Sequence, residues 1–133
     1  MAYEEESMSL DFVLKNFLAP EIINEEKYNE KIDVYSFGIL MFFMLNDGKM
    51  PQITINNIRY RINPYIPSSF TQFAKELINS CLSYDPNDRP SFNEIAQKLE
   101  KSASSLLDLS KSEIKQVDEF IKMHKEKILY YWE

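Results

Sequence analysis

From about residue 32 onward, apolar stretches alternate with short polar breaks, a pattern typical of helices joined by turns. The most apolar stretch runs from Val34 to Leu45, and Asp33 directly before it is a candidate N-cap. Because this stretch is apolar on every side, we expect a helix buried in the centre of the domain. Asn46-Asp47-Gly48 follow it and tolerate the positive φ of a helix end.

A shorter amphipathic helix is predicted over residues 53–62. Ile55, Ile58 and Ile62 recur there at steps of four or three residues, which places them on one face of a helix. Pro64 follows shortly afterwards and prevents the helix from continuing. We therefore expect this element to be brief and to lead into an irregular connection.

Three capping boxes, in which Ser is followed three residues later by Glu or Gln, predict the starts of three more helices. Ser69-Phe70-Thr71-Gln72 precedes an apolar stripe that ends near Tyr84. Ser91-Phe92-Asn93-Glu94 opens the next helix, with Ile95, Leu99 and Ala103 facing inward. Ser110-Lys111-Ser112-Glu113 opens the last one, whose seam is Ile114, Val117, Ile121, His124, Ile128 and Tyr131.

These elements predict a mainly α fold in a single domain, because 133 residues, 44% of them hydrophobic, can bury a sizeable core. We divide the chain into an acidic, poorly ordered segment over residues 1–13, a helical core over 14–107 and a C-terminal amphipathic helix over 108–133. We expect this last helix to pack on the same core, with docking to a partner as the alternative.

The net charge of −6 argues against binding to nucleic acid or to an anionic membrane surface. Val34 to Leu45 is shorter than the roughly 20 residues of a membrane-spanning helix, and the acidic start does not resemble a signal peptide. Cys81 is the only cysteine, which excludes an intrachain disulfide. We therefore expect a cytoplasmic protein that has no membrane segment.

Three motifs carry a resemblance to a known family. Ala19-Pro20-Glu21 matches the Ala-Pro-Glu motif that closes the activation segment of protein kinases. Asp33-Val34-Tyr35-Ser36-Phe37-Gly38-Ile39-Leu40 resembles the start of the central kinase helix, and Asp85-Pro86-Asn87-Asp88-Arg89-Pro90 resembles the Arg-Pro corner near the end of that fold. Because the motifs occur in this order, residues 14–100 resemble protein kinases, and most closely the tyrosine-kinase-like serine/threonine group.

The resemblance implies a truncated helical bundle like the C-lobe of a protein kinase, with an extra C-terminal amphipathic helix. It implies that Glu21, next to Pro20, forms a buried ion pair with Arg89. In the family, the residue matching Asp33 holds the catalytic loop; because that loop is absent here, a local N-cap role is the safer interpretation. For Gly38, packing explains a glycine within a helix, through the close approach of a neighbouring backbone.

The residues that would perform phosphoryl transfer are missing. That reaction needs a glycine-rich loop, a strand lysine, a catalytic Asp and metal-binding Asn and Asp residues. Gly38 and Gly48 are the only glycines, so no such loop can form. We assign no catalytic, cofactor-binding or metal-ligating residue; ATP and magnesium are implied only for the complete family domain. His124, the only histidine, is better explained as a packed side chain than as a metal ligand.

Two functions remain open on this basis. In the first, the chain is part of a kinase domain, inactive in phosphoryl transfer by itself, whose central helix lacks its usual cover and whose partner is the missing N-terminal half. In the second, it is a non-catalytic protein-binding module, a pseudokinase remnant that docks a protein partner through its helical surface or its last helix.

Overall fold

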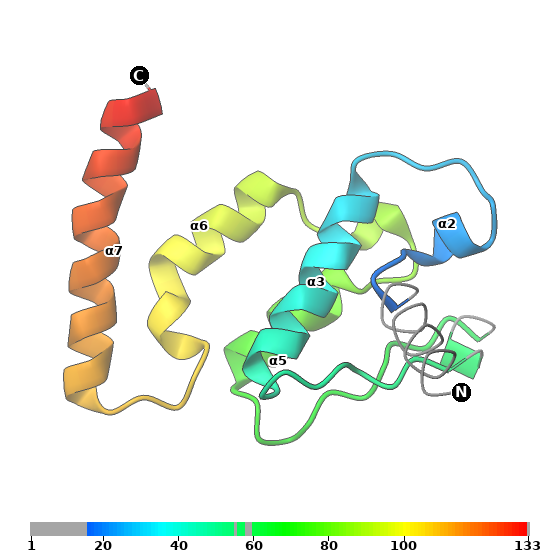
Figure 1. Ribbon diagram of the computed structural model, residues 1–133, viewed down its shortest axis with the longest axis horizontal. Helices are drawn as coiled ribbons and strands as arrows, with labels where there is room; N and C mark the ends of the chain where they lie inside the picture. The colour runs from blue at the N-terminus through cyan, green and yellow to red at the C-terminus, as the bar shows by residue number, and fades with distance from the viewer. Residues whose placement is uncertain (1–15, 55, 58–59, 133) are drawn as a thin grey trace, which may run out of the picture.

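The computed structural model describes residues 16–54, 56–57 and 60–132, and this part of the chain is helical, without strands (Figure 1). The helices are α2 (Pro20–Ile23), α3 (Lys31–Leu45), α5 (Gln72–Cys81), α6 (Phe92–Ser102) and α7 (Lys111–Trp132), with short 3-10 turns η1 (Pro86–Asp88) and η2 (Ala103–Ser105). The predicted mainly α class is confirmed. Figure 1 shows α3 at the centre, and α6 and α7 extending to one side of it.

Helix α3 begins three residues earlier than the sequence predicts. The side-chain oxygen of Asn29 accepts a hydrogen bond from the backbone N–H of Lys31 at 2.9 Å, so the first turn forms ahead of Asp33. Asp33 lies inside that turn and is exposed, and its predicted N-cap role is wrong. Its negative charge still lies near the helix N-terminus, where the helix dipole favours it.

The core forms where α3 packs on α5. Its buried residues from α3 are Val34, Tyr35, Ile39, Met41 and Phe42, and those from α5 are Ala74, Leu77, Ile78 and Cys81. The opposite side of α3 is not covered in the part of the chain that the structure describes, because Leu40 is 42% and Met44 68% exposed. We call Leu40 and Met44 the open face of α3. The expectation that this helix is buried on all sides is therefore wrong.

Gly38 lies where α3 approaches α5 most closely. A Cβ atom added to this residue would lie 2.7 Å from Cys81 Cβ and 3.0 Å from Leu82 Cδ2. Real Cβ atoms do not approach each other this closely. Close approach of a neighbouring element therefore explains the glycine, but the nearest atoms belong to the side chains of Cys81 and Leu82, whereas the sequence predicts the approach of a backbone.

The capping boxes give a mixed outcome. The box at Ser110 is confirmed, since Glu113 N–H donates to Ser110 Oγ at 3.3 Å and Ser110 N–H donates to Glu113 Oε1 at 3.1 Å. At Ser91 the cap forms, because its Oγ accepts from Glu94 N–H at 3.1 Å, but Glu94 Oε1 accepts from the Ser91 hydroxyl at 3.3 Å and not from its backbone N–H. The box at Ser69 is wrong: Thr71 caps α5, accepting from Ala74 N–H at 3.2 Å.

The hydroxyl of Thr71 makes a second hydrogen bond besides the one that caps α5. It donates to the carbonyl of Ser105 at 2.6 Å, which joins the start of α5 to η2. This contact between residues distant in sequence fixes the threonine in place. Helix α5 then ends at Cys81, three residues before the predicted end near Tyr84.

The helix predicted over residues 53–62 is mostly not found among the described residues. Asn56 and Asn57 are helical, Ile53 and Thr54 are not, and the chain turns at Tyr60. Ile55 and Ile58, on which the prediction rested, lie outside the described residues. Asn57 Nδ2 donates a hydrogen bond to the carbonyl of Ile62, further along the chain, at 3.2 Å, which favours a turn over a continued helix.

Helix α7 packs mainly against η2 and stands apart from the α3–α5 core, with α6 between them (Figure 1). Ile114, Val117 and Ile121 of its seam are only half-buried, and an exposed ion pair joins Lys125 to Glu100 of α6. The expectation that α7 packs on the same core is therefore wrong. No helix within the described residues has the length and hydropathy needed to cross a membrane.

Replacing Gly38 by alanine tests the close approach of α3 and α5. Alanine gains about 1 kcal/mol of helix propensity, but overpacking a tight contact costs about 1 to 3 kcal/mol. We expect Gly38→Ala to lower the free energy of unfolding in urea. In a Cys81→Gly background, where the nearest Cβ is removed, the same substitution should lose most of that effect. An equal loss in both backgrounds would contradict the packing explanation.

Candidate functional site

Helix α2 is the element that brings a carboxylate into the interior. Pro20 occupies its first turn, where the missing N–H of proline has no cost and its fixed φ suits the helix. Glu21 follows directly and is only 3% exposed. A carboxylate at this depth requires a charged partner or several hydrogen bonds. The structure supplies both from the corner after α5.

Arg89 meets Glu21 in a bidentate contact. Arg89 Nη1 lies 2.6 Å from Glu21 Oε1, and Arg89 Nη2 lies 2.9 Å from Glu21 Oε2. Arg89 is 2% exposed, and η1 positions it through the turn of Asp85 to Arg89. The two residues are 68 positions apart in sequence. Their contact therefore fixes α2 against the corner that leads into α6.

The remaining donors of Arg89 reach three backbone carbonyls. Nε donates to Ser83 at 2.8 Å, Nη1 to Lys31 at 3.1 Å and Nη2 to Tyr84 at 3.2 Å. With the two bonds to Glu21, all five N–H groups of the guanidinium have acceptors. Lys31 Nζ in turn donates to the carbonyl of Arg89 at 2.6 Å. The pair therefore joins α2, the start of α3 and the chain after α5.

Burial and the charge of Arg89 act in opposite directions on the pKa values of Glu21 and Tyr35. Burial acts to raise the pKa of Glu21, but the hydrogen bonds and charge of Arg89 outweigh it and hold that pKa below its usual range. The Arg89 guanidinium lies over the ring of Tyr35, 5.2 Å from its centroid. Burial raises the pKa of Tyr35 to about 12. At neutral pH Glu21 is ionised and Tyr35 is neutral, so neither is suited to exchange protons with a substrate.

Of the residues that the sequence singles out, the structure brings Pro20, Glu21 and Arg89 together. Asp33 is exposed at the start of α3, and Gly38 is buried against α5. The five residues therefore do not form one site. They divide into an ion pair, a helix contact and a surface carboxylate.

Sequence reasoning missed the groups that surround the pair. Lys31, Tyr35 and Tyr84 all contact Arg89, and Asn24 Nδ2 donates to the hydroxyl of Tyr84 at 3.1 Å. Backbone carbonyls have no sequence signature, so the acceptors of Arg89 could not have been found from spacing. Tyr35 and Lys31 lie within or beside the recognised motif, but nothing in the pattern shows that they face an arginine.

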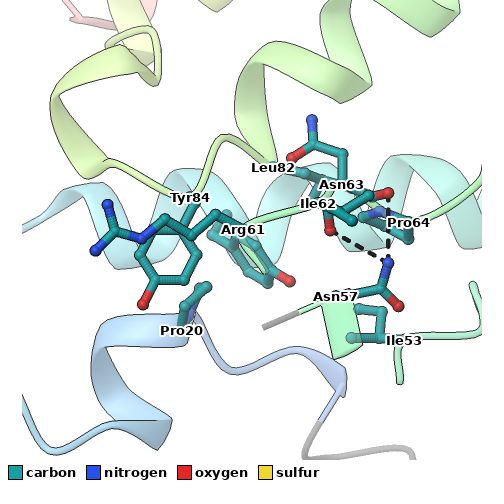
Figure 2. Close-up of a pocket in the computed structure, with 10 residues that line it drawn as sticks. Pro20, Ile53, Asn57, Arg61, Ile62, Asn63, Pro64, Leu82 and Tyr84 are labelled. Carbon is teal, nitrogen blue, oxygen red and sulfur yellow. Dashed lines mark hydrogen bonds between the residues drawn. The ribbon is translucent and has the colours of Figure 1, made fainter. Parts of the chain in front are cut away.

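The pocket next to the pair is small. Residues around the pair and residues of the connection between α3 and α5 line it together: Pro20, Tyr35, Leu82, Tyr84, Ile53, Asn57 and Arg61 to Pro64. Figure 2 shows these side chains converging on the pocket. Its volume is about 20 Å³, room for about one water molecule. Small-molecule sites typically have volumes of about 300 to 1,000 Å³. This pocket is therefore too small for a nucleotide.

Removing Arg89 should destabilise the fold strongly, because Glu21 would remain buried without a partner. Breaking one side of such a pair costs about 3 to 5 kcal/mol. We expect Arg89→Ala to lower the melting temperature far more than Lys101→Ala on the exposed surface of α6. Arg89→Lys should fall between them, since it keeps the charge but loses the bidentate contact. Equal midpoints for Arg89→Ala and Lys101→Ala would contradict the role of the pair.

Acid should weaken the same contact. The pKa of Glu21 in the folded state lies below the ordinary value of 4.5, so the pair contributes its full stability above that pH and loses it as the pH falls through the folded pKa. We expect the free energy of unfolding to decline below about pH 4.5. Glu21→Gln should be less stable at pH 7 and should show a shallower decline in acid. Parallel pH profiles for the two proteins would exclude this contribution.

Comparison with known proteins relates this arrangement to one family. The family model described as "Protein tyrosine and serine/threonine kinase" matches residues 2–99. The motifs indicate a resemblance that begins at residue 14, whereas the family model begins its match at residue 2. It ends close to residue 100, as the motifs predict, and helix α7 lies beyond it.

Curated relatives agree with this match. Dual specificity protein kinase shkE of Dictyostelium discoideum is 38% identical over 62% of this chain, which corresponds to 13% of shkE. Probable serine/threonine-protein kinase drkC of the same organism is 36% identical over 62% of this chain and 12% of drkC. Putative serine/threonine-protein kinase A of Trypanosoma brucei brucei is 34% identical over 61% of this chain and 20% of that protein. The chain therefore spans a fifth or less of the length of these three relatives.

Proposed function

The chain belongs to the protein kinase family, and we propose that it supplies the structural, C-lobe-like part of a kinase domain and does not transfer phosphate by itself. The supporting observation is that both of its glycines have structural uses. Gly38 allows α3 to approach α5. Gly48 follows the end of α3 with a left-handed φ of 75°, and its N–H donates to the carbonyl of Phe43 at 2.9 Å. No third glycine exists to build a phosphate-binding loop.

The open face of α3 supports the same proposal. Leu40 and Met44 lie on the side of α3 away from α5, and both are exposed in the isolated chain. Removing such apolar side chains from water is favourable. We infer that the remaining part of a kinase domain covers this face. In this arrangement Glu21 and Arg89 hold the helical part in shape while other residues bind ATP and magnesium.

Helix α7 favours a second candidate, a non-catalytic module that binds a protein. Phe120 is 58% and Met123 53% exposed on this helix, and its seam is only half-buried. Exposed apolar side chains on a helix suit docking to a partner. In this alternative the chain is a pseudokinase remnant retained for binding.

Thermal melting with MgATP tests the absence of nucleotide binding, which both candidates share. A ligand that binds only the folded state stabilises it, by about 2.7 kcal/mol at a concentration of 100 times its Kd. We expect the melting temperature to be unchanged by millimolar MgATP, and radiolabelled ATP to leave a generic kinase substrate unlabelled. An intact kinase domain serves as the positive control. A clear upward shift would overturn the proposal.

The shape of the same melting curve separates the two candidates. A binding module must fold by itself, so it should give a sharp, cooperative transition and a soluble protein. A part that depends on the rest of a kinase domain should melt broadly and should bind hydrophobic dyes through the open face of α3. Leu40→Lys should reduce that dye binding if the open face is responsible.

A further inference from the structure

Charge is distributed unevenly along this chain. Residues 48–75, which we call the basic segment, run from the end of α3 into the first turn of α5. The segment contains the basic residues Lys49, Arg59, Arg61 and Lys75 and no Asp or Glu. The chain as a whole has 21 acidic and 15 basic residues. No side chain of this segment therefore carries a negative charge, which favours an anionic ligand.

The basic segment also exposes large apolar side chains within a few residues of one another. Tyr60 is 63%, Ile62 59% and Tyr65 77% exposed. Arg61 lies between the first two and is exposed as well. Tyrosine and arginine are enriched among the residues that contribute most to protein interfaces, whereas Lys and Glu are depleted there. The composition of this stretch is thus that of a binding surface.

Arg61 is held in a defined position. Its φ of 57° is in the left-handed region, which residues with a Cβ rarely adopt. The surrounding turn is closed by Ile62 N–H donating to the carbonyl of Asn57 at 2.9 Å, and by Asn57 Nδ2 donating to the carbonyl of Ile62 at 3.2 Å. The guanidinium lies over the ring of Tyr84, 4.9 Å from its centroid (Figure 2). Arg61 is therefore oriented before any ligand arrives.

Arg61 differs from Arg89 in its partners. Arg89 has all five donors occupied, as described above. Arg61 has no ion-pair partner among residues 16–54, 56–57 and 60–132, and its contact with Tyr84 leaves the edge of the guanidinium free to donate. An exposed guanidinium of this kind binds carboxylates in a bidentate manner. The charge, the geometry and the apolar neighbours of Arg61 all fit the same ligand.

We propose that residues 60–65 of the basic segment dock an acidic segment of a partner protein, with a carboxylate on Arg61 and apolar side chains on Tyr60, Ile62 and Tyr65. A nucleic acid fits less well, because its affinity depends on several Lys or Arg side chains that neutralise phosphates, and Arg61 is the one basic side chain among residues 60–65. This surface is separate from the open face of α3. The proposal therefore does not depend on the proposed function.

The test uses the full chain and a fluorescein-labelled octapeptide of glutamate with leucine at every third position. The same peptide with glutamine in place of glutamate is the ligand control. We expect saturable binding of the glutamate peptide in fluorescence anisotropy, and binding at least about tenfold weaker for the glutamine peptide. Binding should weaken as salt rises from low to physiological concentration.

Arg61→Gly is the decisive variant, because glycine adopts a positive φ without strain. Its melting temperature should equal or exceed that of the unchanged chain, while its Kd for the glutamate peptide rises at least about tenfold. Tyr65→Ala, at an exposed position, should also weaken binding. Lys101→Ala, which removes an exposed charge on α6, should leave the Kd unchanged.

Three results would overturn the proposal. The first is equal binding of the glutamate and glutamine peptides, or no binding of either. The second is a loss of affinity in Lys101→Ala as large as that in Arg61→Gly, which would show a general charge effect. The third is tighter binding of an eight-nucleotide single-stranded DNA than of the glutamate peptide, which would assign the surface to nucleic acid.

Discussion

The ion pair between Glu21 and Arg89 holds together the segments on which the rest of the fold depends. Its bidentate contact spans 68 positions of sequence, and the other three donors of Arg89 reach the carbonyls of Ser83, Lys31 and Tyr84. A guanidinium with all five donors occupied can be buried at 2% exposure without leaving a polar group unpaired. The position of α2 against the central helix follows from this arrangement.

The central helix has two sides with opposite properties. On one side Gly38 removes the Cβ that would collide with Cys81, and the two helices approach closely. The close contact buries Cys81, and burial raises the pKa of its thiol to about 11, so that it remains protonated and unreactive at neutral pH. On the other side Leu40 and Met44 face solvent. One side of α3 is therefore tightly packed against α5, whereas its other side is exposed.

The buried groups around α3 have a structural role, and the exposed surfaces differ in their chemistry. The buried side contains an ionised Glu21 and a neutral Tyr35 that maintain structure, and neither exchanges protons readily at neutral pH. Among the residues that the structure describes, large apolar side chains are exposed on the open face of α3, on the outer side of α7 and around Arg61 in the basic segment. Leu40 and Met44 make the first apolar, Phe120 and Met123 lie among charged side chains on the second, and an oriented guanidinium distinguishes the third. These surfaces are suited to different partners.

The sequence by itself determined the helical class, the family resemblance and the presence of Arg89 and Glu21, because apolar spacing and motif order are properties of the chain alone. It also located the caps at Ser91 and Ser110, since a capping box uses only residues within one turn. Interactions within one helical turn can therefore be predicted from the sequence alone.

Only the tertiary structure decided what depends on contacts between distant residues. Thr71 caps α5 because its hydroxyl also reaches Ser105, and α3 begins at Lys31 because Asn29 provides the first acceptor. The exposure of Met44 depends on whether a neighbour exists to bury it, which apolar periodicity does not show. The sequence left this open, since only the first of the two candidate functions leaves the central helix without its usual cover. The same limit applies to α7, whose seam is clear in the sequence although η2, and not the α3–α5 core, is its main neighbour.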